Sequence, residues 1–398
     1  MTAAGNAVRI VDVCGFYSPH GGGVKTYVDR KLRAAHHYGH DLTVIVPGEA
    51  DGLRQVGPRS WLRSIASPRF PLDTRYCYFQ DEPRLHAELD RLAPDFVECG
   101  TPWASAAMVE RWPAPVPRSL VMHLDVFATY PYRWLGGLAE TRTIDRPFEF
   151  FWRRLRRLGS HYDAVVCANR GLVAQLVDHE VPNVVFEPMG VDPGRFSPDL
   201  RDAGLRAALL ASLHLPADAT LLLGVGRFSP EKRWPMIARA VTAAGYRQQL
   251  GLLLVGEGRD RARIERVIAG NPHVRVLDAI RDRGELARLM ASADALVHGS
   301  ESESFGMVGA EARASGLPVI VPDRGGCAEQ AAGGMGWTYR AGDRHALAAL
   351  LGEVAGAPLD ECRARSALAA PFVRTMDQHF AELFARYAAI ASQRRRAA

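Results

Sequence analysis

Residues 220–255, TLLLGVGRFSPEKRWPMIARAVTAAGYRQQLGLLLV, decide the fold of this chain. Thr220–Val225 and Leu252–Val255 are short apolar runs with the length and composition of buried β-strands. Trp234–Ala244 lies between them and carries apolar residues at helical spacing. A strand, a helix and a second strand in this order predict a parallel α/β sheet.

The same alternation extends in both directions along the chain. Downstream, we expect helices at Asp260–Ala269, Gly284–Ala291, Gly309–Ser315 and Met376–Ile390, and strands at Val274–Leu277, Ala295–His298 and Val319–Val321. Upstream, we expect a helix at Val24–Tyr38 and strands at Val8–Val13, Asp41–Val46, Asp95–Cys99, Ser119–His123 and Ala164–Cys167. Residues 49–80, with several arginine, proline and aromatic residues, interrupt the upstream series and are predicted to be an inserted excursion.

A linker separates the two series. Residues 184–200, VVFEPMGVDPGRFSPDL, combine glycine, aspartate and prolines after a short apolar run. At 398 residues the chain is also long for a single core. We therefore expect two Rossmann-like, doubly wound domains, with a ligand in the cleft between them. The first spans residues 1–187 and is completed by a carboxyl-terminal helix within 373–398, and the second spans 188–372.

Composition restricts the class of protein. No stretch approaches about 18 consecutive apolar residues, so no transmembrane helix is expected. The start, MTAAGNAVRIVDVCGF, is typical of a first strand and not of a signal peptide. The six cysteines form no CxxC pair and fit reduced cytosolic thiols better than a disulfide framework or a zinc site. A net charge of +5 permits a nucleotide, a phosphate or an acidic membrane surface as partner.

Gly21-Gly22-Gly23 follows the first predicted strand and opens a helix. Glycines at this position let backbone N–H groups approach a ligand, and a helix amino terminus favours an anion. The loop has neither the GxGxxG spacing of dinucleotide sites nor a P-loop lysine. A tight strand–helix turn explains the three glycines equally well.

Arg227 and Lys232 lie between the first strand and the first helix of the second series. Open α/β sheets bind ligands at this edge. A planar guanidinium fork and an ammonium charge, brought together by a turn, suit a diphosphate. The alternative is a pair of surface charges before a helix.

Two glutamates mark the most informative stretch, residues 298–311. Glu303 precedes a Ser-Phe-Gly turn that leads into a helix, and Glu311 lies within that helix. The turn places the backbone amides of Phe305, Gly306 and Met307 at a helix amino terminus, where an anion is stabilised. The two carboxylates can accept hydrogen bonds from two hydroxyl-bearing parts of one ligand. Taken singly, each glutamate could be a capping or solvated residue.

Residues 303–321, ESFGMVGAEARASGLPVIV, closely resemble the element of two glutamates separated by seven residues in retaining GT-B glycosyltransferases of glycosyltransferase family 4. The resemblance covers nearly the whole chain, because further motifs of that family follow in order and spacing: Gly22–Val24, Met189–Asp192 with Arg195–Pro198, Gly226–Lys232, Gly256–Gly258 and Asp323–Gly326. It departs from the family pattern at Met189 (usually Asn), at Arg233 (usually Gly) and at Asp278–Ile280, where a glycine is common.

The resemblance implies a GT-B architecture and transfer of a hexose from a UDP- or GDP-linked sugar to a lipid, lipid-linked or polysaccharide acceptor, giving an α-glycosidic bond. By the same resemblance, Arg227 and Lys232 bind the donor diphosphate, Glu303 contacts the donor sugar and Glu311 holds the ribose. It further assigns the backbone amides of Gly22, Gly23, Phe305, Gly306 and Met307 to the pyrophosphate and sugar, and His123 to the sugar. A histidine with an ordinary role at a strand end is the alternative for His123.

No Asp-x-Asp cluster or His/Cys ligand spacing indicates a metal, so no metal cofactor is expected. Arg227, Lys232 and helix-terminal amides would instead stabilise the departing diphosphate. The family lacks a convincing carboxylate nucleophile, which implies attack by the acceptor hydroxyl on the face that the diphosphate leaves. The alternatives are an inactive GT-B scaffold, a nucleotide-sugar epimerase and an inverting GT-B enzyme. Retention of both basic residues and both glutamates argues against them.

Residues 146–158, RPFEFFWRRLRRL, interleave aromatic residues with arginines, and residues 54–76 carry further arginines beside Trp61 and Phe70. Basic and aromatic residues on one helix suit an anionic bilayer surface. A core-facing aromatic stripe with a solvated arginine face is an equal alternative. We therefore expect a cytoplasmic protein, with the inner face of the cytoplasmic membrane as a further location. Nucleic acid is not expected as a partner, because no recognised binding module accompanies the charge.

Overall fold

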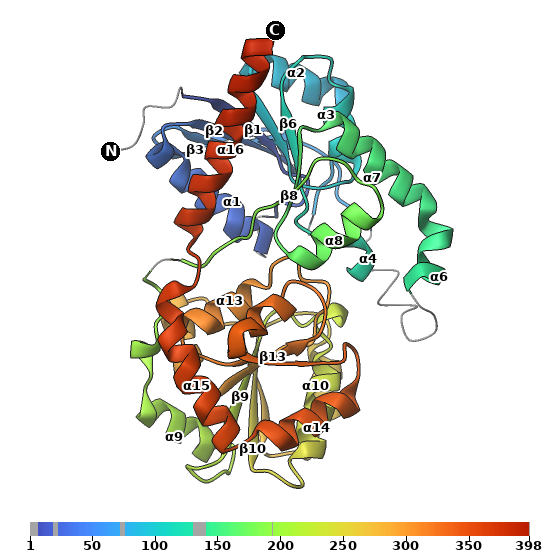
Figure 1. Ribbon diagram of the computed structural model, residues 1–398. Coiled ribbons are helices and arrows are strands. Elements are labelled where there is room, and N and C mark those ends of the chain that lie inside the picture. The colour runs from blue at the N-terminus through green and yellow to red at the C-terminus, as the bar shows by residue number, and fades with distance from the viewer. Residues whose placement is uncertain (1–6, 19–22, 72–75, 130–140, 193, 398) are drawn as a thin grey trace. The chain divides into compact units, whose positions relative to one another are not determined.

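The computed structural model describes residues 7–18, 23–71, 76–129, 141–192 and 194–397 (Figure 1). By its internal contacts the chain divides into two units. Unit 1 comprises Met1–Leu124, Leu138–Pro188 and Asp377–Ala398, and unit 2 comprises Asp125–Gly137 and Met189–Met376. The carboxyl-terminal segment thus belongs to the same unit as the amino-terminal strands.

The described part of unit 1 contains a sheet of eight strands in the order β3-β4-β2-β1-β5-β6-β7-β8. All neighbours pair in parallel except β3 and β4, which are antiparallel. The strands are β1 (Arg9–Val13), β2 (Asp41–Gly48), β3 (Gly52–Gly57), β4 (Ser60–Ala66), β5 (Phe96–Cys99), β6 (Arg118–Val121), β7 (Ala164–Cys167) and β8 (Val184–Phe186). The excursion predicted at residues 49–80 includes the hairpin β3–β4, whose first strand is the edge of the sheet.

The helices of unit 1 lie between these strands in the sequence, except the last one, which follows unit 2. They are α1 (Gly23–Ala34), α2 (Glu82–Leu92), α3 (Ala104–Arg111), α6 (Thr141–Asp145), α7 (Glu149–His161), α8 (Arg170–Asp178) and α16 (Met376–Ala397). Side chains at the amino termini define where two of them begin: Asp81 accepts a hydrogen bond from the Arg84 amide and Asn169 accepts one from the Leu172 amide. Among the described residues, no helix has the length and apolarity needed to cross a membrane.

The carboxyl-terminal helix α16, red in Figure 1, belongs to unit 1, and buried side-chain contacts hold it there. The Tyr387 ring stacks on Phe96 with 4.2 Å between centroids, and its hydroxyl donates to Glu98 at 2.8 Å. Glu98 also pairs with the buried Lys31 of α1, which reaches Asp12 of β1 at 3.1 Å. Burial, together with the charge of Glu98, raises the pKa of Asp12 to about 7. A buried lysine thus links β1, β5 and α1, and α16 joins this network through Tyr387.

The described part of unit 2 contains six parallel strands in the order β11-β10-β9-β12-β13-β14. They are β9 (Thr220–Val225), β10 (Leu250–Val255), β11 (Val274–Leu277), β12 (Ala295–Val297), β13 (Val319–Pro322) and β14 (Gly336–Tyr339). The helix α9 (Ala203–Ser212) precedes these strands. Helices between and after them are α10 (Trp234–Ala244), α11 (Arg261–Ile268), α12 (Arg283–Ser292), α13 (Met307–Ala314), α14 (Arg344–Val354) and α15 (Ala357–Ala369), and α4 (Val126–Thr129) also belongs to this unit.

The strand order of unit 2 reverses at its centre. From β9 the chain first builds outward through β10 and β11, and then returns to place β12 on the other side of β9. Every residue of β9, β10 and β12 is buried, which explains their continuous apolar sequences. In doubly wound sheets, the loops beyond the carboxyl ends of the two strands at such a reversal diverge and leave room for a ligand.

Candidate active site

The two loops at the strand-order reversal of unit 2 carry three of the predicted site residues. Arg227 and Lys232 follow β9, and Glu303 follows β12. Because β9 and β12 are neighbouring parallel strands, their carboxyl ends meet at one edge of the sheet. The fold therefore brings residues more than 70 positions apart to the place where sheets of this order bind ligands.

Lys232 and Glu303 form an ion pair in which the ammonium group donates to Glu303 Oε1. The buried ring of His298 lies behind the carboxylate, with Nε2 at 3.5 Å from the same oxygen. Burial alone would raise the pKa of Glu303, but the charge of Lys232 and the interaction with His298 hold that pKa far below its ordinary value. Burial lowers the pKa of His298. The site thus presents an ionised carboxylate between an ammonium group and a neutral imidazole.

Arg227 lies at the same edge with a more exposed side chain. About half of its side chain is exposed, and its Nη2 is 3.7 Å from Glu231 Oε1. Its backbone is fixed, because the fully buried Trp234 donates its indole N–H to the Arg227 carbonyl at 2.7 Å. An arginine with a fixed backbone and a solvated guanidinium can turn toward an incoming anion.

Arg233, which departs from the family pattern, adopts a left-handed backbone conformation with φ of 53°. Glycine adopts this conformation without strain, which explains the residue expected there. The Arg233 guanidinium pairs with Glu301, in the loop that carries Glu303. This second ion pair, which the sequence did not reveal, joins the same two loops as Lys232 and Glu303.

The turn after β13, Asp323–Gly326, packs against the loop that carries Glu303. The Gly326 amide donates to the Glu303 carbonyl at 2.7 Å. A Cβ atom at Gly326 would lie 2.6 Å from the backbone of Phe305, so only glycine fits at this contact. The glycines of Asp323–Gly326 therefore serve close packing between two loops of the site.

Helix α13 begins immediately after the glutamate loop. Gly306 precedes its first residue, Met307, with φ of 82°, and Phe305 is buried. The first amides of a helix have no acceptor within it and point out of its amino terminus. The structure thus places Phe305, Gly306 and Met307 at the helix amino terminus that the sequence predicted, next to Glu303.

Glu311 lies in the second turn of α13, where its side chain is only 5% exposed. Its Oε1 accepts a hydrogen bond from Arg283, at the start of α12. This partner could not be predicted from the sequence, because the two residues are 28 positions apart and Arg283 belongs to no motif.

The remaining predicted residues belong to unit 1. His123 follows β6, and its ring contacts Tyr27 edge-on with 5.0 Å between centroids. Burial lowers the pKa of His123 to about 4, so the imidazole is neutral near pH 7. Gly23 is the first residue of α1, at the carboxyl-terminal side of β1. Gly22 lies outside the described residues.

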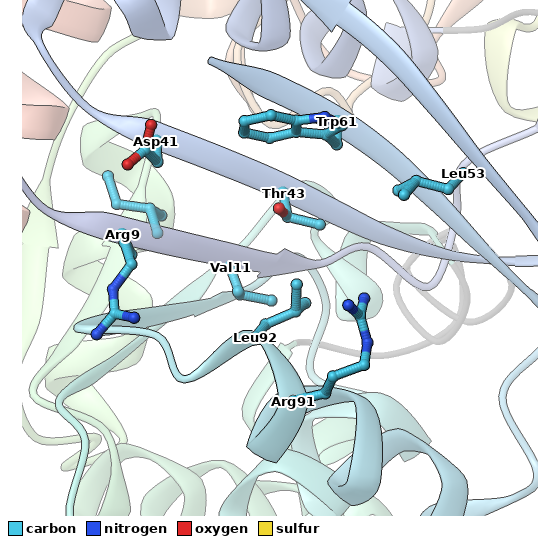
Figure 2. Close-up of a pocket in the computed structure, with 9 residues that line it drawn as sticks. Arg9, Val11, Asp41, Thr43, Leu53, Trp61, Arg91 and Leu92 are labelled. Atoms are coloured by element: carbon cyan, nitrogen blue, oxygen red, sulfur yellow. The ribbon is translucent and has the colours of Figure 1, made fainter.

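Unit 1 also contains a cavity of about 340 Å³ on a face of its sheet, near the amino ends of β1, β2 and β4 (Figure 2). Figure 2 shows Val11, Thr43 and Trp61 on the sheet face, with Arg9 and Arg91 beside them. Arg9 pairs with Asp95, and Arg91 pairs with Glu88. Arg9 is the first residue of β1, so this cavity lies away from the carboxyl ends of the strands and contains none of the predicted site residues.

Comparison with known proteins assigns the family. The model described as Glycosyltransferase Family 4 matches residues 21–195, and the model described as Glycosyl transferases group 1 matches residues 219–355. The chain belongs to glycosyltransferase family 4. A GDP-mannose-dependent alpha-mannosyltransferase of Mycolicibacterium smegmatis is 30% identical over 324 residues, 80% of each chain. A GDP-mannose-dependent alpha-(1-6)-phosphatidylinositol dimannoside mannosyltransferase of Mycobacterium tuberculosis is 30% identical over 323 residues, 79% of each chain.

Solved structures show the fold of this glycosyltransferase. Sucrose-phosphate synthase from Thermosynechococcus elongatus superposes with a TM-score of 0.75 at 20% identity, covering 97% of this chain and 100% of that one. WaaG, a glycosyltransferase involved in lipopolysaccharide biosynthesis, has a TM-score of 0.66 at 16% identity, covering 94% and 98%. The predicted GT-B fold, with two α/β domains built on parallel sheets, is confirmed.

In the part of this glycosyltransferase that the structure describes, no three His, Cys, Asp or Glu side chains come together as metal ligands. Independence from metal stays a prediction. The charged side chains at this edge of the sheet include those of Arg227, Lys232 and Glu303.

Gly306 allows a test of the loop architecture. Alanine at Gly306 would bring Cβ to 2.6 Å from Cys327 Sγ, whereas Gly333 has a similar φ of 73° and open space around it. We expect Gly333→Ala to lower the free energy of unfolding by about 1–2 kcal/mol through backbone strain. Gly306→Ala should cost about 1–3 kcal/mol more through overpacking and should also reduce transferase activity. Urea denaturation and activity assays of the two variants measure this difference, and equal effects would contradict it.

Proposed function

We propose that this glycosyltransferase moves a hexose from a nucleotide-diphosphate sugar to a lipid, a lipid-linked glycan or a polysaccharide, with retention of the α configuration. GDP-mannose is the favoured donor, because relatives at 30% identity are GDP-mannose-dependent mannosyltransferases. The observation that carries the proposal is the Lys232–Glu303 pair at the strand-order reversal of unit 2. It provides a cation for a diphosphate and a carboxylate for a sugar at one edge of the sheet.

In this proposal the basic residues act on the leaving group. Lys232 and Arg227 bind the diphosphate and neutralise the charge that develops on it as the bond to the sugar breaks. The amides of Phe305, Gly306 and Met307 at the start of α13 add the positive end of a helix dipole. These groups would provide what a divalent cation provides in metal-dependent transferases. The backbone amides of Gly22 and Gly23 are proposed to line the same phosphates and sugar.

Glu303 is proposed to position the sugar. Its lowered pKa keeps it ionised at neutral pH, so it accepts hydrogen bonds and does not act as a general acid. Its charge also favours positive character at the anomeric carbon. His123, neutral at pH 7, would donate or accept one further hydrogen bond to a sugar hydroxyl. Glu311 would accept hydrogen bonds from the ribose.

Retention then follows without a covalent intermediate. The acceptor hydroxyl attacks the anomeric carbon on the face from which the diphosphate departs, and a phosphate oxygen takes its proton. One C–O bond breaks and one forms, and the proton ends on the released nucleotide. An α-linked donor gives an α-linked product by this route.

Lys232→Met tests the leaving-group role. Losing one charge-assisted contact to a developing charge should lower kcat for nucleotide release by roughly 10²–10³-fold. Arg266→Met, an exposed residue of α11, is the matched control and should keep full activity. The assay measures GDP released from GDP-mannose, with a membrane lipid extract as acceptor. If Lys232→Met keeps its activity, the role is wrong, and if the wild type turns over neither GDP- nor UDP-sugars, the proposed function is wrong.

A lipid acceptor would require contact with a membrane, for which we propose the amino-terminal part of α7. Four of the apolar residues on this helix are buried in unit 1, as the core-facing alternative expected: Phe151, Trp152, Leu155 and Leu158. Phe150 differs, because it is 60% exposed and lies near the exposed Arg146 and Arg153 in sequence. An exposed aromatic residue beside two cations suits the interface of an anionic bilayer.

Co-sedimentation with liposomes tests this surface. We expect the wild type to sediment with vesicles of phosphatidylcholine and phosphatidylglycerol more than with phosphatidylcholine alone. Replacing Phe150 and Arg153 by serine should reduce this binding, because it removes an inserted ring and about 1 kcal/mol of attraction per cation. Tyr246→Ser, which removes an aromatic residue 88% exposed in unit 2, should not. Sedimentation that is independent of anionic lipid would refute the proposal.

A further inference from the structure

Arg283 connects α12 to the carboxylate of Glu311. Its Nη2 donates to Glu311 Oε1, and its guanidinium carbon lies 5.1 Å from the centre of the Phe196 ring. The Glu311 side chain is 5% exposed, whereas that of Arg283 is 33% exposed. The arginine thus lies between a buried carboxylate and a buried ring, with part of its side chain still open to solvent.

The backbone that carries Arg283 is fixed. Asp282 accepts hydrogen bonds from the amides of Gly284 and Glu285, at 2.7 and 2.8 Å, and so caps the amino terminus of α12. Phe196 is 6% exposed and holds the guanidinium from one side. A side chain held by a cap, a ring and a carboxylate loses little conformational entropy when a ligand arrives.

The buried carboxylate of Glu311 depends on this partner. Removing a carboxylate from water is costly unless it is paired and hydrogen-bonded. Arg283 provides the opposite charge at Oε1 and so fixes the orientation of the carboxylate.

A further polar atom of Arg283 lies at this place. Among the described residues, its Nε is buried without a hydrogen-bond partner. A buried donor without a protein acceptor is costly, and a ligand oxygen would remove that cost. A ligand with many acceptor oxygens would therefore be stabilised by a hydrogen bond from Arg283 Nε.

We propose that Arg283 is a positioning residue for the nucleoside half of the donor. It holds the Glu311 carboxylate in a fixed orientation, so that this carboxylate accepts hydrogen bonds from both ribose hydroxyls. The inference rests on the proposed function, because it takes the ribose as the ligand of Glu311. The opposite role, in which Arg283 competes with the ribose for Glu311, is an outcome that the test distinguishes.

Nucleotide binding to two ligands that differ only in the ribose hydroxyls tests this role. Calorimetric titration with GDP and with 2′,3′-dideoxy-GDP gives the dissociation constants of the wild type, Arg283→Gln and Arg283→Lys. For Arg283→Gln we expect the Kd of GDP to rise about tenfold, in line with the loss of a charge-assisted hydrogen bond. The Kd of the dideoxy nucleotide should change less than about twofold, because it offers no diol to the carboxylate. Arg283→Lys keeps the positive charge but lacks the planar guanidinium group. Its Kd for GDP should therefore lie between that of the wild type and that of Arg283→Gln.

Arg288→Gln is the matched control. It makes the same change one to two turns later in α12, where Arg288 is 57% exposed and pairs with Asp202, and it should leave both dissociation constants unchanged. Binding of inorganic pyrophosphate and thermal unfolding show that each variant keeps its diphosphate site and its fold. If Arg283→Gln does not fold, the Arg283→Lys comparison decides.

Three results overturn the inference. Equal weakening of GDP and dideoxy-GDP would mean that Arg283 does not act through the ribose. Unchanged binding of GDP would mean that it has no positioning role, and tighter binding would mean that it competes for Glu311. A wild type that binds neither GDP nor UDP would refute the proposed function itself, which is a separate failure.

Discussion

The site of this glycosyltransferase depends on the reversal of strand order between β9 and β12. Two neighbouring parallel strands send their loops in opposite directions there, and the diverging loops leave space at the sheet edge. Two ion pairs, Lys232 with Glu303 and Arg233 with Glu301, tie these loops together across that edge. Opposite charges that are partly buried need one another, because either alone would carry an uncompensated desolvation cost. The ion pairs that hold the two loops together therefore also provide charged groups of the candidate site.

This arrangement explains how one small region can serve two parts of a donor. In the proposed mode of binding, the ammonium group of Lys232 would offer a charge to a phosphate, while Glu303, held ionised, would offer a hydrogen-bond acceptor to a sugar. Helix α13 begins beside Glu303 and carries Glu311 one to two turns further on, so its length separates the acceptors proposed for sugar and ribose. With Arg283 and Phe196, the proposed site extends to α12 and to the linker.

Much of the fold could be predicted because the decisive segments are buried. β7, β9 and α10 have the predicted bounds, since strands buried on both faces and an amphipathic helix leave clear apolar patterns. The two strands of the hairpin β3–β4 could not be predicted, because the partly exposed edge strand, GLRQVG, lacks such a pattern. Positions near Glu303 followed from motif order, whereas Arg233–Glu301 and Arg283–Glu311 did not. Those pairs join residues 68 and 28 positions apart, and only the tertiary fold brings them into contact.

The most direct test of this account is a crystal structure of the chain with GDP-mannose bound. We expect diphosphate oxygens at about 2.7–3.2 Å from Lys232 Nζ and the Arg227 guanidinium, at the carboxyl ends of β9 and β12. The mannose would then contact Glu303. A diphosphate bound elsewhere on the molecule, with Lys232 and Arg227 out of its reach, would contradict the central claim.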